Sequence, residues 1–424
     1  MPYSLRMKRI SCINCSSEKL RDFLDLGYQP NGNNFSTSKE RGKEKYFPLV
    51  MLVCENCWQV QIDEFPPQEM LFLEHPYLTG LNETVLHHFE QLADDVINSV
   101  SLPSGSLVLD IGCNDGSLLQ AFKRRGMEVA GVDPGVIPGE IAKQAGFTVF
   151  RTFWNLSTGV DLHKKSFFPD LITATAVFYH VPDLHDFIAG LKQVMKANTV
   201  FVVQCVSLME LIKQNQFDHF YHEHSCIHSV TALNRLFEST GLKIIKVQDY
   251  DIHGGSFVLY ITLTTYPDCF DNGLQKALKR EKDAGLCSLD TFYQFSRRVN
   301  QNGQGLVSKL KYLKDSGNRI YALGAPAKGS TLINFCDINI DLIDCAVEVN
   351  QNKIGCFIPG TNIPIISESK VLCEPDYYLV LTWNFLDFFI EKYNNYLETG
   401  GYFIVPVPSV QIIGKECGSA ARII

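Results

Sequence analysis

Short apolar runs that alternate with stretches of helical period restrict the fold of this chain more than any other feature. The central part of the sequence contains four such runs, at residues 107–110, 128–133, 170–174 and 199–203. Apolar strands separated by helices are typical of βαβ units around a mostly parallel sheet, because the helices cover both faces. We therefore predict an α/β fold for this part, residues 73–266.

A second set of such runs follows a charged stretch. Residues 276–283 and 292–315 have a helical period and predict a helical linker over residues 267–315. Strand-like runs then alternate with helical segments again, which predicts a second, smaller α/β domain over residues 316–424. Its expected strands are residues 319–323, 344–349, 376–381 and 401–407.

Four of the fourteen cysteines form two Cys-x-x-Cys pairs, Cys12 with Cys15 and Cys54 with Cys57, in a first block of residues 1–72. Two such pairs supply the four thiolates that a closed, tetrahedral zinc site needs. Redox Cys-x-x-Cys motifs usually occur singly at a helix start, and free thiols would not need this spacing. We therefore predict a structural Zn²⁺ ion in a small N-terminal domain.

A glycine-containing loop follows the first central strand, with the spacing Asp-x-Gly-x-x-x-Gly. Glycines allow a tight turn at the carboxyl edge of the sheet, where doubly wound folds bind ligands, and a buried acid suits a cationic ligand better than a pyrophosphate. The pattern resembles the first motif of Rossmann-like S-adenosylmethionine-dependent methyltransferases. The alternative is a turn that binds nothing. The expected cofactor-binding residues are Asp110, Gly112, Asn114, Asp115, Gly116 and, at the end of the next strand, Asp133 as a ribose acceptor.

Residues 217–225 place three histidines, one glutamate and one tyrosine within six positions. A catalytic metal is disfavoured, because His-Glu-His within three residues cannot put both imidazoles on one helix face. General acid–base chemistry is favoured: a histidine oriented by a carboxylate beside a tyrosine hydroxyl. The alternative is a solvated polar turn. His180 ends another strand-like segment and is expected to face the same cleft.

Over nearly its full length the chain resembles the three-domain, zinc-binding sugar C-methyltransferases of deoxysugar biosynthesis, best known as nucleotide-sugar 3-C-methyltransferases. The resemblance implies a Rossmann-like class I S-adenosylmethionine methyltransferase core, a small N-terminal zinc-binding domain and a C-terminal Rossmann-like α/β domain that helps hold the nucleotide sugar. It is carried by both cysteine pairs and by residues 25–30, 110–116, 217–224, 253–256, 324–331 and 383–385, in that order.

The resemblance also implies a reaction, in which a carbon of a nucleotide-linked 4-keto-deoxy sugar, with C-3 expected, is methylated through an enolate. By position, His224 corresponds to the base and Tyr221 to the donor for the enolate oxygen. Glu223 would orient or polarise this pair. His180 and Tyr77 would line the cleft, and His253 would contact the substrate.

The turn at residues 324–329 follows a predicted strand, and Lys328 with neighbouring amides is suited to hold a phosphate. Glu348 ends the next strand, at the position where Rossmann folds carry an acidic residue. A nicotinamide site is possible by spacing, but the loop lacks the order GxGxxG, so we favour a pocket for the nucleotide sugar. The chain departs from the family pattern at Gln204, Ala176 and Val258, which are expected at the cofactor edge and the substrate pocket.

Composition restricts the partners. With 46 acidic and 38 basic residues the formal net charge is −8, which argues against binding to nucleic-acid phosphates or anionic lipid. No apolar run approaches the roughly 20 residues that span a bilayer, and a polar segment follows residues 1–9 where a signal peptide would be apolar. We expect a cytoplasmic protein with a small-molecule substrate. The alternative functions are methylation of another small metabolite and a non-catalytic zinc-containing scaffold.

Overall fold

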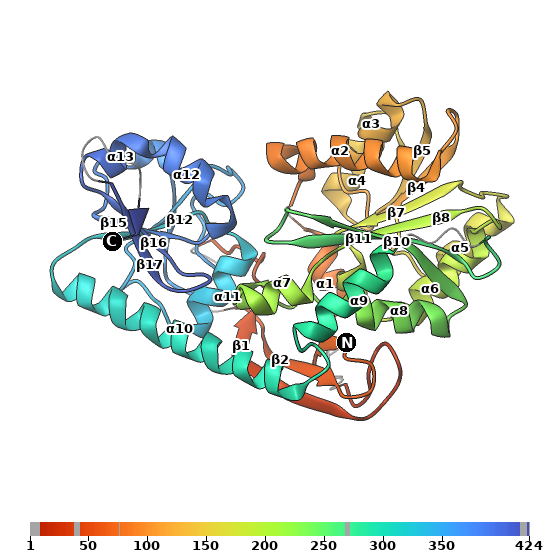
Figure 1. Cartoon of the computed structure of the whole chain (residues 1–424). Helices are drawn as coiled ribbons and strands as arrows, with labels where there is room; N and C mark the ends of the chain where they lie inside the picture. The colour runs from red at the N-terminus through yellow and green to blue at the C-terminus, as the bar shows by residue number, and fades with distance from the viewer. Residues whose placement is uncertain (1–8, 38–42, 76, 268–271, 416–421, 424) are drawn as a thin grey trace.

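Three β-sheets organise the chain (Figure 1). The computed structural model describes residues 9–37, 43–75, 77–267, 272–415 and 422–423. The α/β fold predicted from the alternation of strands and helices is confirmed for the central and C-terminal parts of the chain.

The N-terminal sheet has four antiparallel strands in the order β1-β2-β3-β9. Its last strand comes from the middle of the chain, directly after the histidine-rich segment. A sheet edge pairs through its main chain, so a two-residue strand can join it without any pattern of its own. The sheet therefore extends beyond the predicted first block of residues 1–72. The strands are β1 (Leu20–Pro30), β2 (Tyr46–Cys54), β3 (Val60–Ile62) and β9 (Cys226–Ile227).

The central sheet has seven strands in the order β10-β11-β8-β7-β4-β5-β6. The five strands from β8 to β6 are parallel, and the two outer strands that follow the histidine-rich segment are antiparallel. All seven residues of β8 are buried, as expected for a strand covered on both faces. The strands are β4 (Leu107–Ile111), β5 (Glu128–Val132), β6 (Thr148–Phe150), β7 (Leu171–Thr175), β8 (Val200–Val206), β10 (Leu242–Tyr250) and β11 (Ser256–Leu263).

Helices cover both faces of the central sheet. Figure 1 shows α2, α3 and α4 on one side of it and α5, α6 and α8 on the other. The helices are α2 (Glu83–Val100), α3 (Ser117–Arg124), α4 (Val136–Gln144), α5 (Leu156–Lys164), α6 (Leu184–Val194) and α8 (Val230–Ser239), with the short α1 (Gln68–Phe72), α7 (Leu208–Lys213), η1 (Thr79–Leu81), η2 (Phe178–His180) and η3 (Phe217–His219) in connections.

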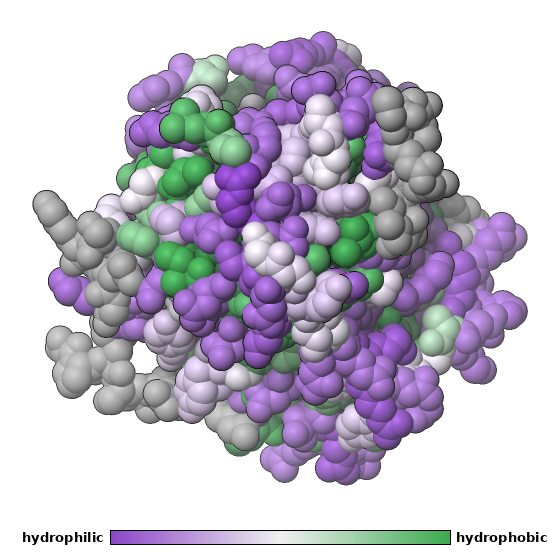
Figure 2. All heavy atoms as spheres, turned by 90° about the vertical axis from the view of Figure 1, so that its left-hand side faces the viewer, coloured by the Kyte–Doolittle hydropathy of each residue, from purple (hydrophilic) through white to green (hydrophobic). Residues whose placement is uncertain are grey.

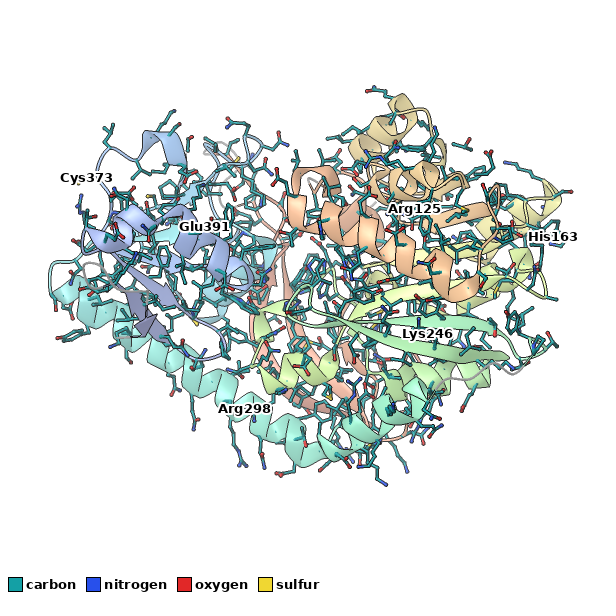
Figure 3. All side chains as sticks on the ribbon, turned by 45° about the horizontal axis from the view of Figure 1, so that its top comes forward. Arg125, His163, Lys246, Arg298, Cys373 and Glu391 are labelled. Atoms are coloured by element: carbon teal, nitrogen blue, oxygen red, sulfur yellow. The ribbon has the colours of Figure 1, made fainter. Side chains whose placement is uncertain are left out.

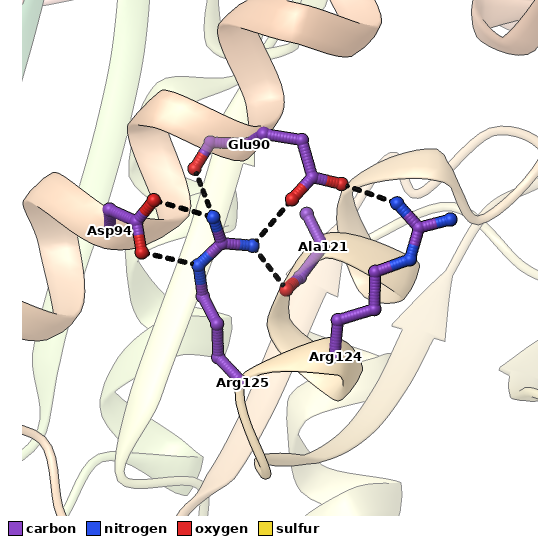
Figure 4. A network of polar contacts seen from close by, with 5 residues as sticks. All are labelled: Glu90, Asp94, Ala121, Arg124 and Arg125. Carbon is purple, nitrogen blue, oxygen red and sulfur yellow. Dashed lines mark hydrogen bonds and ion pairs between the residues drawn. The ribbon is translucent and has the colours of Figure 1, made fainter.

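Arg125, which caps the C-terminal end of α3, fixes α3 against α2 (Figure 4). Its guanidinium donates two hydrogen bonds to the Asp94 carboxylate, at 2.6 and 2.5 Å, and one to the Glu90 carboxylate at 2.6 Å. It also donates to the carbonyl oxygens of Glu90 and Ala121, each at 2.9 Å. The paired contact with Asp94 is the planar geometry that arginine, and not lysine, provides.

The C-terminal sheet also has seven strands, in the order β14-β13-β12-β15-β16-β17-β18, of which the first five are parallel. Its elements are β12 (Ile320–Leu323), α11 (Ala327–Phe335), β13 (Ala346–Glu348), β14 (Ile365–Ser367), η4 (Glu368–Lys370), β15 (Tyr377–Val380), η5 (Trp383–Phe385), α12 (Leu386–Lys392), α13 (Asn394–Glu398), β16 (Tyr402–Val405), β17 (Gln411–Gly414) and β18 (Arg422–Ile423).

The helical segment between the two α/β parts consists of α9 (Gly273–Asp283) and the 27-residue α10 (Leu289–Asp315). Phe292 of α10 packs on Phe23 of β1, with ring centroids 5.1 Å apart. Arg298, labelled in Figure 3, donates to the carbonyl of Ile212 at the end of α7 at 2.9 Å. The helix is therefore more than a linker, because it contacts the N-terminal sheet and the central part as well.

The face that the C-terminal part presents in Figure 2 is mainly hydrophilic, with hydrophobic residues in small separate groups. Within the described ranges, none of the helices combines the length and the apolar character that crossing a bilayer requires.

Candidate active site between the three sheets

A cavity of about 540 Å³ lies where the three parts of the chain meet. Its lining comes from the carboxyl ends of the parallel central strands, from the histidine-rich segment, from a loop after β1 and from the start of α11. This is the edge at which doubly wound sheets bind ligands. Most of the residues singled out in the sequence lie here.

The glycine loop turns as predicted, with φ of +75° at Gly112 and +84° at Gly116. A Cβ at Gly112 would lie 2.3 Å from Val177, and one at Gly116 would lie 2.7 Å from Phe147. Both positions therefore need glycine for the backbone and for packing against protein side chains. Gly112 lines the cavity, whereas Gly116 lies outside its lining.

Two buried carboxylates at the ends of β4 and β5 line the cavity. Asp110 accepts a hydrogen bond from the Thr173 hydroxyl at 2.7 Å, and burial raises the pKa of Asp110 to about 7. Asp133 accepts from the main-chain N–H groups of Asn114 (2.8 Å) and Gly135 (2.7 Å). Two acids with few cationic partners fit a ligand that carries positive charge, as S-adenosylmethionine does.

The side chains of Asn114 and Asp115 hold the segment before α2. Asn114 accepts from Thr79 N–H (3.0 Å) and donates to the Tyr77 carbonyl (3.2 Å), while Asp115 accepts from Gly80 N–H (2.6 Å). Asn114 also lines the cavity, whereas Asp115 lies outside the lining. Tyr77 lies in the cavity lining as predicted, and enclosure there raises the pKa of its phenol to about 12.

The histidine-rich segment is buried, which excludes the alternative of a solvated turn. His224 N–H donates to the Tyr221 carbonyl at 2.8 Å, and this turn puts the two rings side by side with centroids 4.0 Å apart. The His180 ring stacks on His224 at 5.2 Å. Burial lowers the pKa of His224 to about 3 and that of His180 well below its usual value, so both imidazoles are neutral near pH 7.

Three imidazole nitrogens in this cluster have no hydrogen-bond partner among the described residues. His224 Nδ1, His180 Nε2 and His219 Nε2 are buried without a hydrogen-bond partner, and all three residues line the cavity. Burial raises the pKa of Tyr221 well above its usual value, so its hydroxyl remains a hydrogen-bond donor. A buried, unsatisfied polar group costs free energy unless a ligand pairs with it. The cluster is therefore suited to a polar substrate.

The Glu223 carboxylate has different partners from those expected. It accepts from the Asn33 amide at 2.7 Å and lies 3.0 Å from Nε2 of His75. Within the described part of the chain it forms no hydrogen bond with His224 or Tyr221, so the carboxylate does not orient that pair through a hydrogen bond. The side chain extends instead toward the loop after β1 and the segment after α1.

Lys328 lies in the cavity lining in the first turn of α11, as the phosphate-site prediction requires. Its ammonium donates to Asn384 Oδ1 at 2.6 Å and lies 4.4 Å from the centre of the Trp383 ring. Burial lowers its pKa, and Asp218 opposes this effect. His253 also lines the cavity, with a left-handed φ of +56°.

Glu348 lies outside the cavity lining. Its carboxylate accepts from the main-chain N–H groups of Ala325 (3.1 Å), Val349 (2.8 Å) and Asn350 (3.1 Å), and these bonds fix the first turn of the C-terminal domain. Lys353, 3.9 Å from Glu348, reaches the cavity in its place.

Of the three positions at which the chain departs from the family pattern, one lies at the cavity. Ala176 lines it with a left-handed φ of +57°. Gln204 is buried behind it, where its Oε1 lies 2.7 Å from His88 Nε2, and Val258 is fully buried in β11. Neither of these two residues belongs to the lining.

The four predicted metal ligands converge at the start of the N-terminal sheet. Their Sγ atoms all lie within 4.8 Å of one another, with Cys12–Cys57 at 3.4 Å and Cys15–Cys54 at 3.6 Å. Sulfurs around a tetrahedral zinc ion with bonds of about 2.3 Å are separated by about 3.8 Å, so these residues fit a structural Zn²⁺ ion. In the part of the chain that the structure describes, no second group of this kind occurs.

Sequence reasoning missed several residues of the cavity. His219 lies in the histidine-rich segment and His75 lies two residues before Tyr77, but nothing in the sequence pattern separates these two histidines from their neighbours. Asn33 and Lys353 have no local signal, because each reaches the cavity only through the packing of its domain.

Comparison with known families divides the chain into three consecutive parts. A model described as "Putative zinc binding domain" matches residues 12–72, one described as "Methyltransferase domain" matches residues 85–247, and one described as "C-methyltransferase C-terminal domain" matches residues 251–408. The three matches follow the order of the three sheets.

Individual proteins give the same picture. The C-methyltransferase NovU of Streptomyces niveus is 29% identical over 407 residues, which cover 96% of this chain and 97% of NovU. A ubiquinone biosynthesis O-methyltransferase of Hahella chejuensis (strain KCTC 2396) is 31% identical over 115 residues, 26% of this chain and 48% of that protein.

Among solved structures, the magnesium protoporphyrin IX methyltransferase ChlM from Synechocystis PCC 6803 with bound SAM is 18% identical, and the match covers 42% of this chain and 80% of ChlM. The TM-score is 0.32, and we base no argument on a likeness of that size. The three consecutive domain matches and the similarity to NovU over nearly the full length support an S-adenosylmethionine-dependent methyltransferase with a zinc-binding domain, similar to the C-methyltransferases.

Proposed function

We propose that this enzyme methylates a carbon of a nucleotide-linked 4-keto-deoxy sugar, with C-3 the expected carbon, through an enolate. The observation that carries the proposal is the pairing of a neutral imidazole, His224, with a neutral phenol, Tyr221, in a cavity that a lysine of the C-terminal domain also lines. A base, a donor for an oxyanion and a cation are the groups that such a substrate needs.

S-adenosylmethionine, when bound, supplies an electrophilic methyl group. Asp133 is placed to accept hydrogen bonds from ribose hydroxyls, and Asp110 brings negative charge near a cationic ligand. Gly112 and Asn114 form the adjoining edge of the cavity.

The proposed acid–base chemistry rests on protonation states. A carbon next to a ketone loses a proton to a base held against it, and the neutral His224, with Nδ1 unpartnered, is able to accept that proton. The Tyr221 hydroxyl donates to the oxygen on which negative charge develops. His180 and Tyr77 border the same space and contribute polar groups for the sugar.

The nucleotide end of the substrate is proposed to lie toward α11. Lys328 is in the first turn of that helix, where an ammonium group and free main-chain N–H groups attract phosphate. We assign residues 1–72 to zinc binding, 73–266 to methyl transfer, 267–315 to the helical linker and 316–424 to the hold on the nucleotide sugar. His253 is proposed as a further substrate contact. Burial and the charge of Lys328 lower the pKa of its imidazole to about 4.

The test is incubation of the purified enzyme with methyl-deuterated S-adenosylmethionine and a panel of nucleotide-linked 4-keto-6-deoxy sugars, followed by mass spectrometry. Fragmentation locates the label. Label on a ring carbon supports the proposal, while label on oxygen or nitrogen contradicts the enolate. If the enzyme binds the cofactor but labels none of the sugars, its acceptor is another small metabolite.

A further inference from the structure

The Glu223 carboxylate is buried next to the proposed base, with only 3% of the residue exposed. We propose that Asn33 and His75 are positioning residues that hold this carboxylate in place, so that the loop after β1 completes the reaction site. The catalytic effect of this arrangement rests on the proposed function, whereas the placement of Glu223 by Asn33 and His75 does not.

Both oxygens of Glu223 have a partner, one from the N-terminal domain and one from the segment that follows α1. The Asn33 amide donates to Oε1 at 2.7 Å, and His75 Nε2 lies 3.0 Å from Oε2. On the other side of the His75 ring, Nδ1 accepts from the main-chain N–H of Tyr77 at 3.2 Å. A neutral ring with its proton on Nε2 satisfies both contacts, so the Tyr77 main chain selects the tautomer that donates to Glu223.

The loop that carries Asn33 is wedged between two domains. Gly32 lies so close to the start of α11 that a Cβ there would be 2.9 Å from the Ala327 carbonyl oxygen. Asn33 N–H donates to Asn31 Oδ1 at 3.1 Å, which sets the turn, and the ammonium of Lys353 lies 4.8 Å from the centre of the Phe35 ring. The N-terminal domain thus holds the Asn33 amide at a fixed position in the cavity lining.

The surroundings keep the carboxylate ionised. Burial raises the pKa of Glu223, but the hydrogen bonds from His75 and from the Asn33 amide hold that pKa below its usual value. Lys353 adds positive charge from the C-terminal domain, while the phenols of Tyr179 and Tyr221 face the same carboxylate as neutral groups.

This anion has a use in the proposed reaction. When a buried imidazole takes up a proton, the new positive charge lacks water to stabilise it. Glu223 raises the pKa of His180, and the His180 ring stacks on that of His224. A carboxylate held beside the stacked pair therefore stabilises the charge that proton transfer creates, without touching the base.

Two substitutions of His75 separate its two contacts. His75→Gln can keep a donor at the position of Nε2, whereas His75→Asn can keep only an acceptor at the position of Nδ1. We expect His75→Asn to lower kcat about 10- to 100-fold, the effect of losing a hydrogen bond to a charged group, and His75→Gln to recover most of it. KM for S-adenosylmethionine should stay the same in both.

Asn33 has a matched control in its exposed neighbour Asn34. Asn33→Ala should lower kcat about 10-fold and move the acidic limb of the pH profile to higher pH, since Glu223 loses a group that lowers its pKa. Asn34→Ala should change neither. Equal losses in the two histidine variants, or in the two asparagine variants, would overturn the proposal, because a purely structural role predicts that pattern.

A substrate-free measurement separates this inference from the proposed function. Nuclear magnetic resonance of the zinc-loaded, histidine-labelled full chain, with the His75 signal assigned from the two variants, gives the tautomer and the pKa of the ring. We expect a proton on Nε2 and a lower pKa in Glu223→Gln. That result upholds the placement even if no sugar is methylated, and an unchanged His75 pKa in Glu223→Gln refutes it.

Discussion

The chemistry of the cavity depends on side chains that burial keeps neutral. His224 and His180 lose their charge, and Tyr221 keeps its proton, because no water reaches them to stabilise an ion. A bound ligand can then supply the missing hydrogen bonds. A polar substrate therefore gains free energy in this cavity that it would not gain at a solvated histidine cluster.

Replacing His224 by Asn should reduce methyl transfer by about 10²- to 10⁴-fold, because the base is lost while the size of a polar side chain is partly kept. Affinity for S-adenosylmethionine should not change, since the cofactor edge is formed by other residues. Initial rates and calorimetric titration test this. His87→Asn, at an exposed position of α2, is the control, and an equal loss of rate in it would contradict the assignment.

Asp110 should make stability depend on pH. Burial raises the pKa of Asp110 from 3.8 to about 7. The protonated carboxyl contributes its full stability only below the pKa of the unfolded chain, and this contribution is lost as the pH rises through 7. Asp110→Asn keeps an acceptor for Thr173 and removes this loss. Without cofactor at pH 8, urea unfolding should show the variant more stable by up to about 4 kcal/mol, and the difference should shrink toward pH 4. The same pH dependence in both proteins would contradict this.

At the scale of elements, contacts between helices and between strands place the cavity lining. The glycine loop follows β4, and the histidine-rich segment lies between α7 and β9. Because β9 pairs with β3, the segment is held at one end by the central sheet and at the other by the N-terminal sheet. Its shape therefore depends on both sheets.

The α2–α3 contact gives a test of side-chain geometry. Arg125→Lys keeps the charge but loses the paired hydrogen bonds to Asp94, and we expect the free energy of unfolding to fall by about 1 kcal/mol. Arg124 makes a single ion pair with Glu90, at 2.7 Å, from a more exposed position, so Arg124→Lys should change it by less than about 0.5 kcal/mol. Urea unfolding with fluorescence detection distinguishes the two, and equal effects would show that the paired geometry is unimportant.

Loss of zinc should affect the cavity as well as the N-terminal sheet. Cys54→Ser removes one ligand at the end of β2, which pairs with β1, the strand that precedes the Asn33 loop. We expect the variant to lose its zinc, to melt at a lower temperature and to lose most of its methyl transfer. Zinc content, thermal melting and rate are the measurements. Cys287→Ser, at an exposed cysteine, should retain all three, and a Cys54→Ser protein with full activity would disprove the coupling.

At the scale of the whole molecule, the cavity exists only where all three parts meet. Asp218 of the histidine-rich segment accepts a hydrogen bond from Trp383 of the C-terminal part at 2.7 Å, and Lys328 packs on the same tryptophan. These contacts join the histidine-rich segment to the C-terminal part across the cavity.

Lys328→Met should raise KM for the nucleotide sugar about 10-fold or more, because a charge-assisted hydrogen bond to phosphate is lost, and should leave cofactor affinity unchanged. Steady-state kinetics with varied sugar measures this. Lys370→Met, at an exposed lysine of the same domain, should have no effect. An unchanged KM in Lys328→Met would place the phosphates elsewhere.

By itself, the sequence determined the features that are local in the chain. The alternation of apolar runs predicted both parallel sheets, the spacing of Cys12, Cys15, Cys54 and Cys57 predicted the metal site, and the glycine spacing predicted the turn after β4. Each of these follows from backbone geometry or ligand spacing within a short segment.

Only the tertiary structure decided which of these side chains reach the cavity. Asp115 and Glu348 use their carboxylates for main-chain N–H groups, and Glu223 turns to Asn33 and His75. Tertiary packing brings several possible hydrogen-bond partners from distant segments to each polar atom, and that packing decides which of them it binds. A local sequence pattern contains no information about it.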